Sequence, residues 1–378
     1  MIPCYVTFFV RLGSILKKIV FLTTSYRDTG PTQQLFNIIS RLNRKRFKPI
    51  LISLTDPVRH DRFKCFEELS IDTYSLGINK ASAILSLGRI KKLIIMLDPH
   101  LIHSHGLVPD LLVVISRLSV PHVLTIRNDP YLDYPTKFGR IRGTVMAYFH
   151  VLAIRACPAA IACSDALQRT FLKYGVNAKM VRNGVDPSFI ETDFIEEFLD
   201  PKISRFITAG SLIPRKNIEF MVSVFGCNEL RSRANFLILG DGFLRSKCQQ
   251  LSGDNISMAG HVDKPYRFLS SSQYYISLSK SEGMPNSVIE ALMVGLPCVL
   301  SNIGPHKEIY SLMPNYIHLV DCSMDAQGVA ADISLWLDSA GSFDNKDIRS
   351  RAIEEFHADA TYLKYQKIYL DQIGSRNV

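Results

Sequence analysis

Two carboxylates flank a Gly-x-Pro turn in the C-terminal third of the chain. Residues 275–297 read YISLSKSEGMPNSVIEALMVGLP, with Glu282 before the turn and Glu290 eight positions later. The apolar spacing predicts a short strand, then a helix with Glu290 in its first turn. A helix N-terminus exposes unpaired N–H groups and suits a phosphate, while carboxylates accept hydrogen bonds from sugar hydroxyls. The pattern therefore indicates a site for a nucleotide-sugar. A structural interpretation stays open, since Glu is favoured in any first turn and Gly and Pro mark any turn.

A pair of adjacent cations forms the second candidate group. Arg215 and Lys216 lie in the segment GSLIPRKN that begins at Gly210, just after a predicted strand at 205–208. The carboxyl ends of strands in an open α/β sheet are where ligands bind. Arg grips phosphate oxygens in pairs and Lys supplies a point charge, so both suit a leaving diphosphate. A solvated basic turn is the alternative.

The N-terminal half offers weaker signals. Gly30 follows a predicted strand at 18–25 and permits close backbone approach to a ligand, although a plain turn explains it nearly as well. His103 and His105 alternate on a predicted strand end, but no third metal ligand is in sequence reach. The chain also contains no Asp-x-Asp motif, so we expect no metal cofactor and a diphosphate bound by cations and a helix dipole.

Composition indicates a folded enzyme with two cores. The chain has 378 residues, of which 47% are hydrophobic and 21% charged, and this length exceeds one ordinary core. No apolar run approaches the roughly 20 residues of a membrane-spanning helix. Residues 1–17 lack the pattern of a secretory signal and are interpreted as an irregular leader. The eight cysteines form no Cys-x-x-Cys pair, which favours reduced thiols in a cytoplasmic protein.

Charge is distributed unevenly along the chain. Residues 1–190 hold 26 Lys and Arg against 12 Asp and Glu, whereas the remainder holds 18 against 23. Basic clusters at 41–48 and at 91–92 either attract the N-terminal half to anionic lipid headgroups or are simply solvated helix ends. Nucleic acid is not expected as a partner, because no zinc-finger spacing or aromatic-interleaved basic run occurs.

Strands alternate with helices throughout, which predicts parallel sheets covered by helices. The first series has strands at 18–25, 49–54, 71–76, 101–104 and 122–126, with helices at 84–96 and 107–118. The second has strands at 205–208, 235–239, 256–258 and 298–301, with helices at 218–225 and 244–251. The acidic, turn-rich segment 185–197 is a plausible connector. The sequence thus predicts two Rossmann-like domains with a site between them.

The stretch from Gly260 to Glu308 resembles the signature of retaining glycosyltransferases of family 4, which have the GT-B architecture. The resemblance implies that Glu282 binds hydroxyls of the transferred sugar, Glu290 the nucleotide ribose and Lys216 the diphosphate. Ser211 stands where the family commonly has Arg, so Arg215 is expected to take more of that load. Glu282, Lys216 and Arg215 are the expected catalytic residues. The implied donor-binding set is Gly30, Gly210, Arg215, Lys216, Val262, Glu282, Gly283, Met284, Pro285, Asn286, Ser287 and Glu290.

Three further positions are candidates for sugar or acceptor contact: His105, Arg127 and Asn128. Arg127 falls where many family 4 enzymes have His, which puts a His-dependent mechanism in doubt. The surrounding segment TIRNDPYLDYP resembles bacterial transferases that assemble O-antigen or capsule repeats. Pinning of a loop by hydrogen bonds is a comparable explanation. The family's Gly-Asp-Gly at 240–242 and Asn-Gly-Val-Asp at 183–186 are explained by turns.

The resemblance implies an α/β, GT-B fold with a deep interdomain cleft. Residues 1–185 are expected to form the acceptor-side domain, 186–357 the nucleotide-sugar domain, and 358–378 a helix packing back on the first domain. The expected activity is retaining, metal-independent transfer from a nucleotide-sugar, with UDP weakly favoured over GDP, to a lipid-linked cell-surface saccharide. The expected location is the inner face of the cytoplasmic membrane. The alternatives are a GT-B nucleotide-sugar epimerase and a non-catalytic binder of anionic glycolipid.

Overall fold

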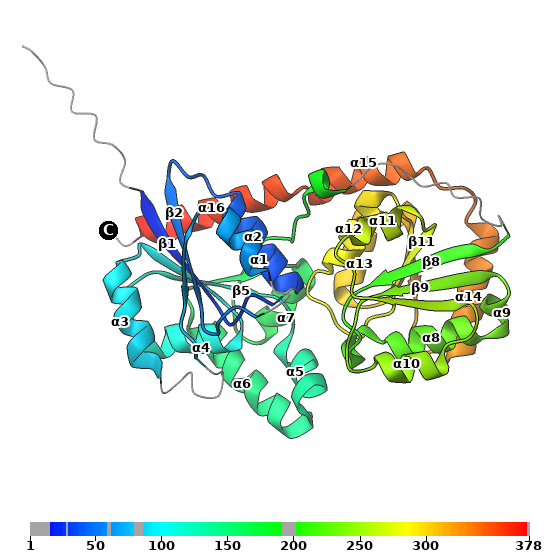
Figure 1. Cartoon of the computed structure of the whole chain (residues 1–378), viewed down its shortest axis with the longest axis horizontal. Helices are drawn as coiled ribbons and strands as arrows, with labels where there is room; N and C mark the ends of the chain where they lie inside the picture. Colours follow the sequence, from blue (N-terminus) through cyan, green and yellow to red (C-terminus); the bar gives the residue numbers. More distant parts are fainter. Residues whose placement is uncertain (1–15, 28, 59–61, 79–85, 191–201, 376–378) are drawn as a thin grey trace, which may run out of the picture.

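The structure is a computed structural model that describes residues 16–27, 29–58, 62–78, 86–190 and 202–375. The predicted leader, apart from residues 16 and 17, and most of the predicted connector lie outside these ranges. The described residues form two α/β units side by side, with the long terminal helix returning toward the first (Figure 1).

The N-terminal domain is built on a seven-stranded parallel sheet of order β3-β2-β1-β4-β5-β6-β7. Its strands are β1 (Lys17–Thr23), β2 (Phe47–Ser53), β3 (Asp72–Ser75), β4 (Leu101–His105), β5 (His122–Ile126), β6 (Ala159–Ala162) and β7 (Lys179–Met180). Its helices are α1 (Gly30–Ser40), α2 (Phe63–Glu68), α3 (Leu87–Leu97), α4 (Leu107–Ser116), α5 (Pro130–Phe138), α6 (Arg140–Ala156) and α7 (Asp165–Lys173).

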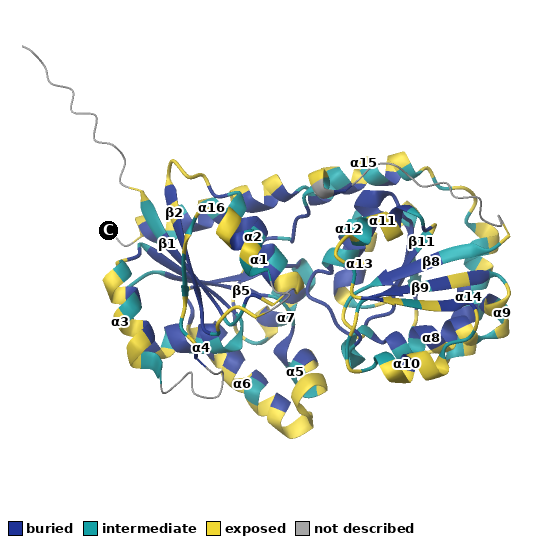
Figure 2. Ribbon diagram, viewed as in Figure 1, coloured by how far each residue is buried: buried dark blue, intermediate teal, exposed yellow. Residues whose placement is uncertain are grey.

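Alternating side chains of the central strands fill two separate cores. Ile19 and Phe21 of β1 point into one cluster, and Val20 and Leu22 point into the other. Successive residues of a strand face opposite sides of the sheet, so a strand covered on both faces is apolar throughout. Burial of the sheet interior in both domains is visible in Figure 2.

The C-terminal domain repeats this construction with a six-stranded parallel sheet of order β10-β9-β8-β11-β12-β13. Its strands are β8 (Ser204–Ala209), β9 (Ala234–Leu239), β10 (Ile256–Gly260), β11 (Tyr274–Ser277), β12 (Cys298–Ser301) and β13 (Ile317–Val320). Its helices include α8 (Ile218–Gly226), α9 (Asn228–Arg231), α10 (Arg245–Leu251), α11 (Pro265–Ser270), α12 (Asn286–Val294), α13 (Gly304–Leu312), α14 (Ala326–Ser339) and α15 (Asn345–Phe356). Short 3-10 turns occur at Pro187–Phe189, Pro214–Lys216 (η4) and Pro314–Tyr316.

The chain passes between the domains at two adjacent points. Val185 and His357 form an isolated parallel bridge, and the amide of Ala358 donates to the carbonyl of Val185. Helix α16 (Ala358–Gly374) then packs into the N-terminal core, where Tyr362, Tyr365 and Tyr369 are buried beside β1. The predicted GT-B fold, with its returning terminal helix, is confirmed.

The structure differs from the sequence prediction at two places near the site. Helix α12 begins at Asn286, directly after Pro285, so Glu290 lies in the second turn and the prediction of a first-turn position was wrong. Helices α5 and α6 were not predicted, because Pro135, Gly139 and Gly143 interrupt the segment and α6 shows little amphipathic contrast.

The structure provides one observation each on the predictions about membrane spanning and about the cysteines. Among the helices of the described residues, none combines the length and hydropathy that crossing a membrane requires. The seven cysteines within the described ranges are all free thiols.

Candidate functional site

Glu282 lies at the centre of an ion-paired cluster with both predicted cations. Its Oε2 accepts a hydrogen bond from Arg215 Nη1 at 2.7 Å, and its Oε1 lies 2.7 Å from Lys216 Nζ. The carboxylate is only 7% exposed, and Ser279 Oγ also donates to Oε1 at 2.8 Å. The structure therefore brings together the three residues that the sequence predicted as catalytic.

The charges of this cluster fix the ionisation of Glu282. Burial alone would raise the pKa of the carboxyl, but the charges of Lys216 and Arg215 and the Lys216 hydrogen bond hold it well below its usual range. Glu282 is therefore ionised at neutral pH and neutralises Lys216 and, together with Asp133, Arg215.

The turn that follows β8 positions the two cations. Residues Pro214–Lys216 form η4 after β8, and Asn217 ends it in the left-handed region with φ 58°. The Asn217 side-chain amide donates to the carbonyl of Leu278, and the amide of Lys280 donates to the carbonyl of Arg215. These bonds lock the cation turn to the segment that carries Glu282. Gly210, at φ 152°, faces the turn, and a Cβ there would lie 3.4 Å from the Lys216 Cε.

The N-terminal domain reaches the same cluster through α5. Asp133 Oδ1 lies 3.1 Å from Arg215 Nε, which places Arg215 between Asp133 of one domain and Glu282 of the other. Beside it, Ser281 Oγ donates to Asn128 Oδ1 at 3.1 Å. Gly283 packs so tightly on the first domain that an added Cβ would come within 1.9 Å of the Arg127 carbonyl oxygen. The facing side chains of the two domains thus meet directly.

Asn286, at the start of α12, is the hub of a second contact between the domains. Its Oδ1 accepts hydrogen bonds from Asn183 Nδ2 at 2.9 Å and from Gln34 Nε2 at 3.1 Å. Its Nδ2 lies 3.4 Å from the carbonyl oxygen of Gly30, so the predicted glycine loop does approach the predicted donor helix. Asn183 also donates to the carbonyl of Met284. The side chain of Asn183 therefore does more than form the turn that its motif predicted.

The remaining predicted donor residues surround the head of α12. Met284 and Pro285 are buried, Asn286 and Ser287 are half-buried, and the helix has no side-chain cap on its first amides. Val262 is partly buried against the apolar core cluster to which the buried residues of α12 belong. Glu290 lies outside the Glu282 cluster, near Tyr266, whose pKa is raised by burial and then by the Glu290 charge. The two carboxylates thus occupy separate parts of one site.

The glycines at 240 and 242 have a structural explanation. A Cβ at Gly240 would come within 1.9 Å of the Gly210 carbonyl oxygen, and one at Gly242 within 2.4 Å of the Leu212 carbonyl oxygen. Their small size lets the loop after β9 pack on the loop after β8, which carries Arg215 and Lys216.

The predicted sugar or acceptor contacts lie at the carboxyl ends of β4 and β5. His105 is buried and neither ring nitrogen has a hydrogen-bond partner among the described residues. Burial and then the Arg127 charge keep the pKa of His105 well below its usual value. Arg127 donates from Nη1 to Asn183 Oδ1 but leaves Nε and Nη2 unpaired within the described part of the chain. His103, in contrast, is held by Tyr369 and Thr125.

His306, in the first turn of α13, is a candidate that the sequence analysis missed. The Ser301 hydroxyl donates to the Ser279 carbonyl, so it must accept from His306 Nδ1, which lies 3.0 Å away. Nδ1 therefore carries the proton and Nε2 is an acceptor, without a hydrogen-bond partner in the described ranges. Burial lowers the pKa of His306 to about 4, although the Glu282 charge opposes this. No sequence motif marks His306 as a candidate site residue.

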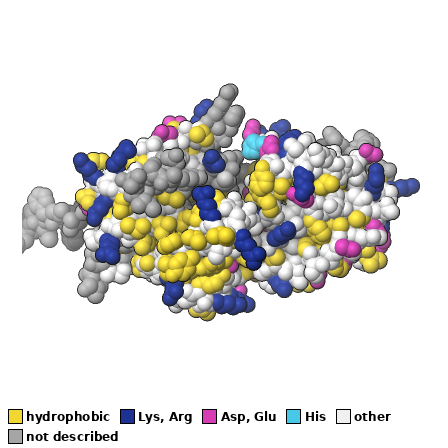
Figure 3. All heavy atoms as spheres, turned by 90° about the horizontal axis from the view of Figure 1, so that it is seen from below, with side chains coloured by type: hydrophobic (Ala, Val, Ile, Leu, Met, Phe, Trp, Pro, Cys, Tyr) yellow, Lys and Arg dark blue, Asp and Glu magenta, His cyan; other side chains and the backbone are white. Residues whose placement is uncertain are grey.

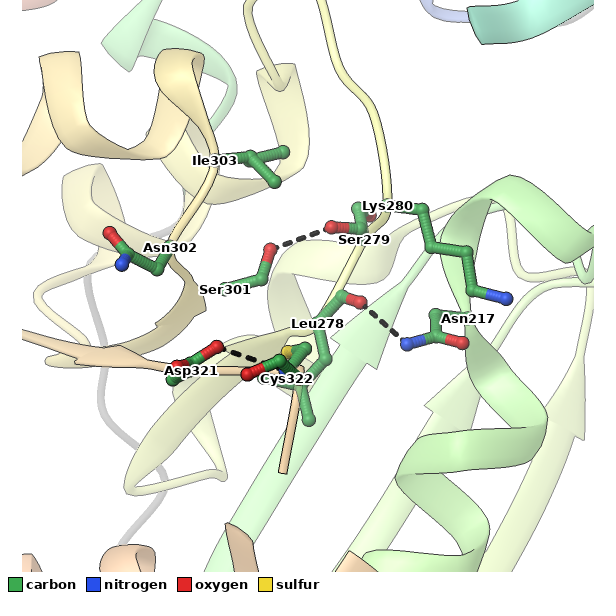
Figure 4. Close-up of a pocket in the computed structure, with 10 residues that line it drawn as sticks. Asn217, Leu278, Ser279, Lys280, Ser301, Asn302, Ile303, Asp321 and Cys322 are labelled. Atoms are coloured by element: carbon green, nitrogen blue, oxygen red, sulfur yellow. Dashed lines mark hydrogen bonds between the residues drawn. The ribbon is translucent and has the colours of Figure 1, made fainter. Parts of the chain in front are cut away.

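A cavity of about 220 Å³ opens at the carboxyl ends of β11, β12 and β13 (Figure 4). Its lining residues are Asn217, Leu278, Ser279, Lys280, Ser301, Asn302, Ile303, Asp321, Cys322 and Ser323. None of the predicted donor residues lines it. Within the described residues no group of three His, Cys, Asp or Glu side chains is placed to hold a metal ion.

Buried neutral histidines should make the protein sensitive to mild acid. Burial lowers the pKa of both His122 and His306 to about 4. Below about pH 6.5 the unfolded chain binds protons that the folded protein does not, so stability is full above that pH and falls toward pH 4 by about 1.4 kcal/mol per pH unit for each such His. Glu282 stays ionised throughout this window. We expect the melting temperature to fall steadily as the pH drops from about 6.5 to 5.

A His306→Gln variant should show a shallower fall than the wild type when melting is followed by circular dichroism. The exposed His261→Gln is the matched control and should follow the wild-type curve. A melting temperature that stays level from pH 7 to pH 5 would contradict the assignment.

Two Rossmann-like domains that face each other across polar residues from both define the GT-B class of glycosyltransferases. Family comparison agrees. Residues 29–189 match the model described as Glycosyltransferase Family 4, and residues 204–338 match the model described as Glycosyl transferases group 1. The chain belongs to these glycosyltransferases, and the recognition made from its sequence is confirmed.

Known proteins with similar sequence are named as glycosyltransferases, and a solved structure shares the fold. The chain is 24% identical over 321 residues to the O-antigen biosynthesis glycosyltransferase WclY of Escherichia coli, covering 78% of this chain and 83% of the relative. It is 24% identical over 216 residues to the UDP-Gal:alpha-D-GlcNAc-diphosphoundecaprenol alpha-1,3-galactosyltransferase of Escherichia coli, covering 52% and 55%. The Anabaena HepE structure, solved with UDP and glucose, superposes with a TM-score of 0.74 at 15% identity, covering 93% of this chain and 99% of that chain.

Proposed function

We propose that this glycosyltransferase moves a sugar, with retention at the anomeric carbon and without a metal, from a nucleotide-sugar to a lipid-linked cell-surface saccharide. The observation that carries the proposal is the pairing of the Glu282 carboxylate with Lys216 and Arg215 at the head of α12. Two cations and a helix N-terminus match a diphosphate, and a carboxylate freed from them matches sugar hydroxyls.

The exchange of partners gives each residue a role. The donor diphosphate displaces Glu282 from Lys216 and Arg215, and the amides that begin α12 bind its remaining oxygens. Glu282 then accepts hydrogen bonds from the sugar, and Glu290 is the proposed partner of the nucleotide ribose. As the bond to the anomeric carbon breaks, the two cations stabilise the charge on the leaving diphosphate, which is the task of a divalent ion in metal-dependent transferases.

Retention follows from the same geometry in this proposal. A leaving diphosphate held on one face of the sugar accepts the proton of the acceptor hydroxyl as that hydroxyl attacks the same face. Glu282 is engaged by two cations and a hydroxyl, so it is suited to orienting the sugar and not to attacking it. The unpaired nitrogens of His105, Arg127 and His306 offer further contacts to the transferred sugar or the acceptor.

The substrates proposed here agree with the names of related proteins. One relative is named for a UDP-galactose donor and a diphosphoundecaprenol-linked acceptor, and the HepE structure was solved with UDP and glucose. We therefore favour a UDP-sugar over a GDP-sugar and a role in O-antigen or related polysaccharide biosynthesis. A lipid-linked acceptor places the enzyme on the cytoplasmic face of the membrane that holds the lipid.

A donor screen followed by product analysis tests the proposal. We expect UDP-sugars to raise the melting temperature more than GDP-sugars, since a ligand that binds only the native state stabilises it. Transfer to a saccharide diphosphate-lipid acceptor should then persist in excess EDTA and give a product whose anomeric proton shows the donor's configuration by NMR.

Other outcomes would replace the proposal. An altered nucleotide-sugar formed without acceptor would indicate an epimerase. Glycolipid binding without any turnover would indicate a binding protein.

A further inference from the structure

The helices α5 and α6 form a hairpin whose outer face is apolar and has no partner in the described structure. The exposed residues Ile141, Val145, Tyr148, Phe149 and Leu152 recur at helical spacings of three and four along α6, and they are between 38% and 84% exposed. The opposite stripe of α6 is buried, so this helix is apolar on both sides. Figure 3 shows hydrophobic side chains gathered over this underside of the N-terminal domain.

The same hairpin is strongly basic. The one acidic residue of the two helices, Asp133, is buried and pairs with Lys137, whereas Arg140, Arg142 and Arg155 are all exposed. Arg142 lies over the ring of the exposed Phe138, with 6.0 Å between its Cζ and the ring centroid. Apolar side chains edged by cations match the interface of an anionic bilayer, where the apolar groups enter the acyl boundary and the cations meet headgroups.

Buried polar contacts hold the hairpin rigidly on the sheet. His150 of α6 bonds to the Tyr134 hydroxyl of α5 at 2.7 Å and to Asp110 of α4 at 2.9 Å. Asp110 in turn accepts from Ser104 of β4. Gly143 lets the two helices touch, since a Cβ there would lie 2.5 Å from the Pro135 backbone. An exposed apolar face on a rigid element is a built surface and not a frayed end.

We propose that the α5–α6 hairpin is the surface by which this protein docks on an anionic lipid membrane. A second copy of the chain is the less suitable occupant, because self-association through this face would bring the three exposed arginines of each copy together. The hairpin also places the membrane beside the site, since Asp133 of α5 pairs with Arg215. The basic cluster at 41–48 is less available, because Arg41 pairs with Asp186 and Asp359 and Lys48 with Asp72.

Vesicle binding of the purified full-length protein tests this inference. We expect co-sedimentation with phosphatidylglycerol vesicles, weaker binding to phosphatidylcholine vesicles, and a decline with added salt. The triple variant Ile141→Ser, Tyr148→Ser, Phe149→Ser should bind at least about tenfold more weakly, and Arg140→Gln with Arg142→Gln should lose about tenfold on anionic vesicles alone. The matched control, Leu335→Ser with Leu363→Ser, removes equally exposed apolar groups on α14 and α16 and should bind as wild type.

The inference rests on the proposed function only in assuming a lipid-linked acceptor. The outcomes of the vesicle experiment therefore test the docking surface separately from the transferase activity. Wild-type protein that ignores anionic vesicles, or a folded triple variant that binds them fully, would overturn the docking surface. A wild-type dimer that the triple variant converts to monomer, by light scattering, would assign the face to a second copy instead. Vesicle binding needs no turnover, so an absence of transferase activity would leave the result intact.

Discussion

Replacing Glu282 by Gln is expected to lower transfer by about 10² to 10³ while leaving the protein folded. The amide keeps the volume of the carboxylate and its bond to Ser279, but it removes the negative charge that Lys216 and Arg215 share. Lys216 then loses its ion pair while Arg215 keeps the one with Asp133, and removing one partner of a buried ion pair costs about 3–5 kcal/mol, so the melting temperature of the free variant should fall. A nucleoside diphosphate should restore the melting temperature, because the Glu282 carboxylate no longer competes with it for Lys216 and Arg215. Turnover should therefore collapse while diphosphate affinity, measured by titration calorimetry, holds or rises.

Lys216→Ala provides the contrast, because it should lose both turnover and diphosphate affinity. Glu354→Gln, on the exposed face of α15, is the matched carboxylate control and should behave as wild type. Wild-type turnover in purified Glu282→Gln would remove Glu282 from the donor site. Diphosphate affinity that falls equally in the Glu282 and Lys216 variants would refute the competition between carboxylate and diphosphate.

Gly283→Ala should abolish productive contact between the domains without disturbing either core. The added Cβ would come within 1.9 Å of the Arg127 carbonyl oxygen and 3.0 Å of Cys163 Sγ. The Arg127 carbonyl belongs to the backbone just after β5, so it cannot move aside as a flexible side chain could. The domains must then stand apart by an ångström or more, which breaks the contacts of Asn128 with Ser281 and of Asp133 with Arg215. A displacement of about 1 Å at a reacting centre costs about 100-fold in rate.

We expect kcat to fall by about that factor while diphosphate affinity, which depends on C-terminal residues, changes little. Small-angle scattering should report a larger radius of gyration than for the wild type. Gly226→Ala is the control, because nothing lies within 4 Å of its added Cβ. A Gly283→Ala enzyme with wild-type kcat would show that the contact seen here is not the one used in turnover.

The fold could be predicted well wherever an element repeats one period. Strand β1 and helix α8 are found within about two residues of their predicted limits, because an unbroken apolar run and a 3.6-residue stripe each have one interpretation. Helices α5 and α6 could not be predicted in this way. Pro135 lies inside α5, Gly143 serves close packing, and a helix that is apolar on both faces has no stripe to detect.

The site likewise contains some residues that the sequence predicts and others that it does not. Glu282, Arg215 and Lys216 could be named from sequence, because each lies in a short segment whose residue types already suit a diphosphate and a sugar. The contact of Arg215 with Asp133 and those of Asn286 with Gln34 and Asn183 could not, since these partners lie far along the chain in ordinary turns and helices. Only the packing of one domain against the other brings such residues together. Glu290 shows the smaller error of a helix start misplaced by a turn.

The N-terminal domain can complete its apolar core only after helix α16 has been synthesised. Tyr362, Tyr365 and Tyr369 fill the core beside β1, although more than 330 residues of chain separate them from that strand. During synthesis the first half leaves the ribosome with that face uncovered, whereas the second domain has its whole sheet available earlier. The half that is translated first is therefore the last to close its core, and a nascent chain that stops short of α16 exposes an apolar surface for chaperones to hold.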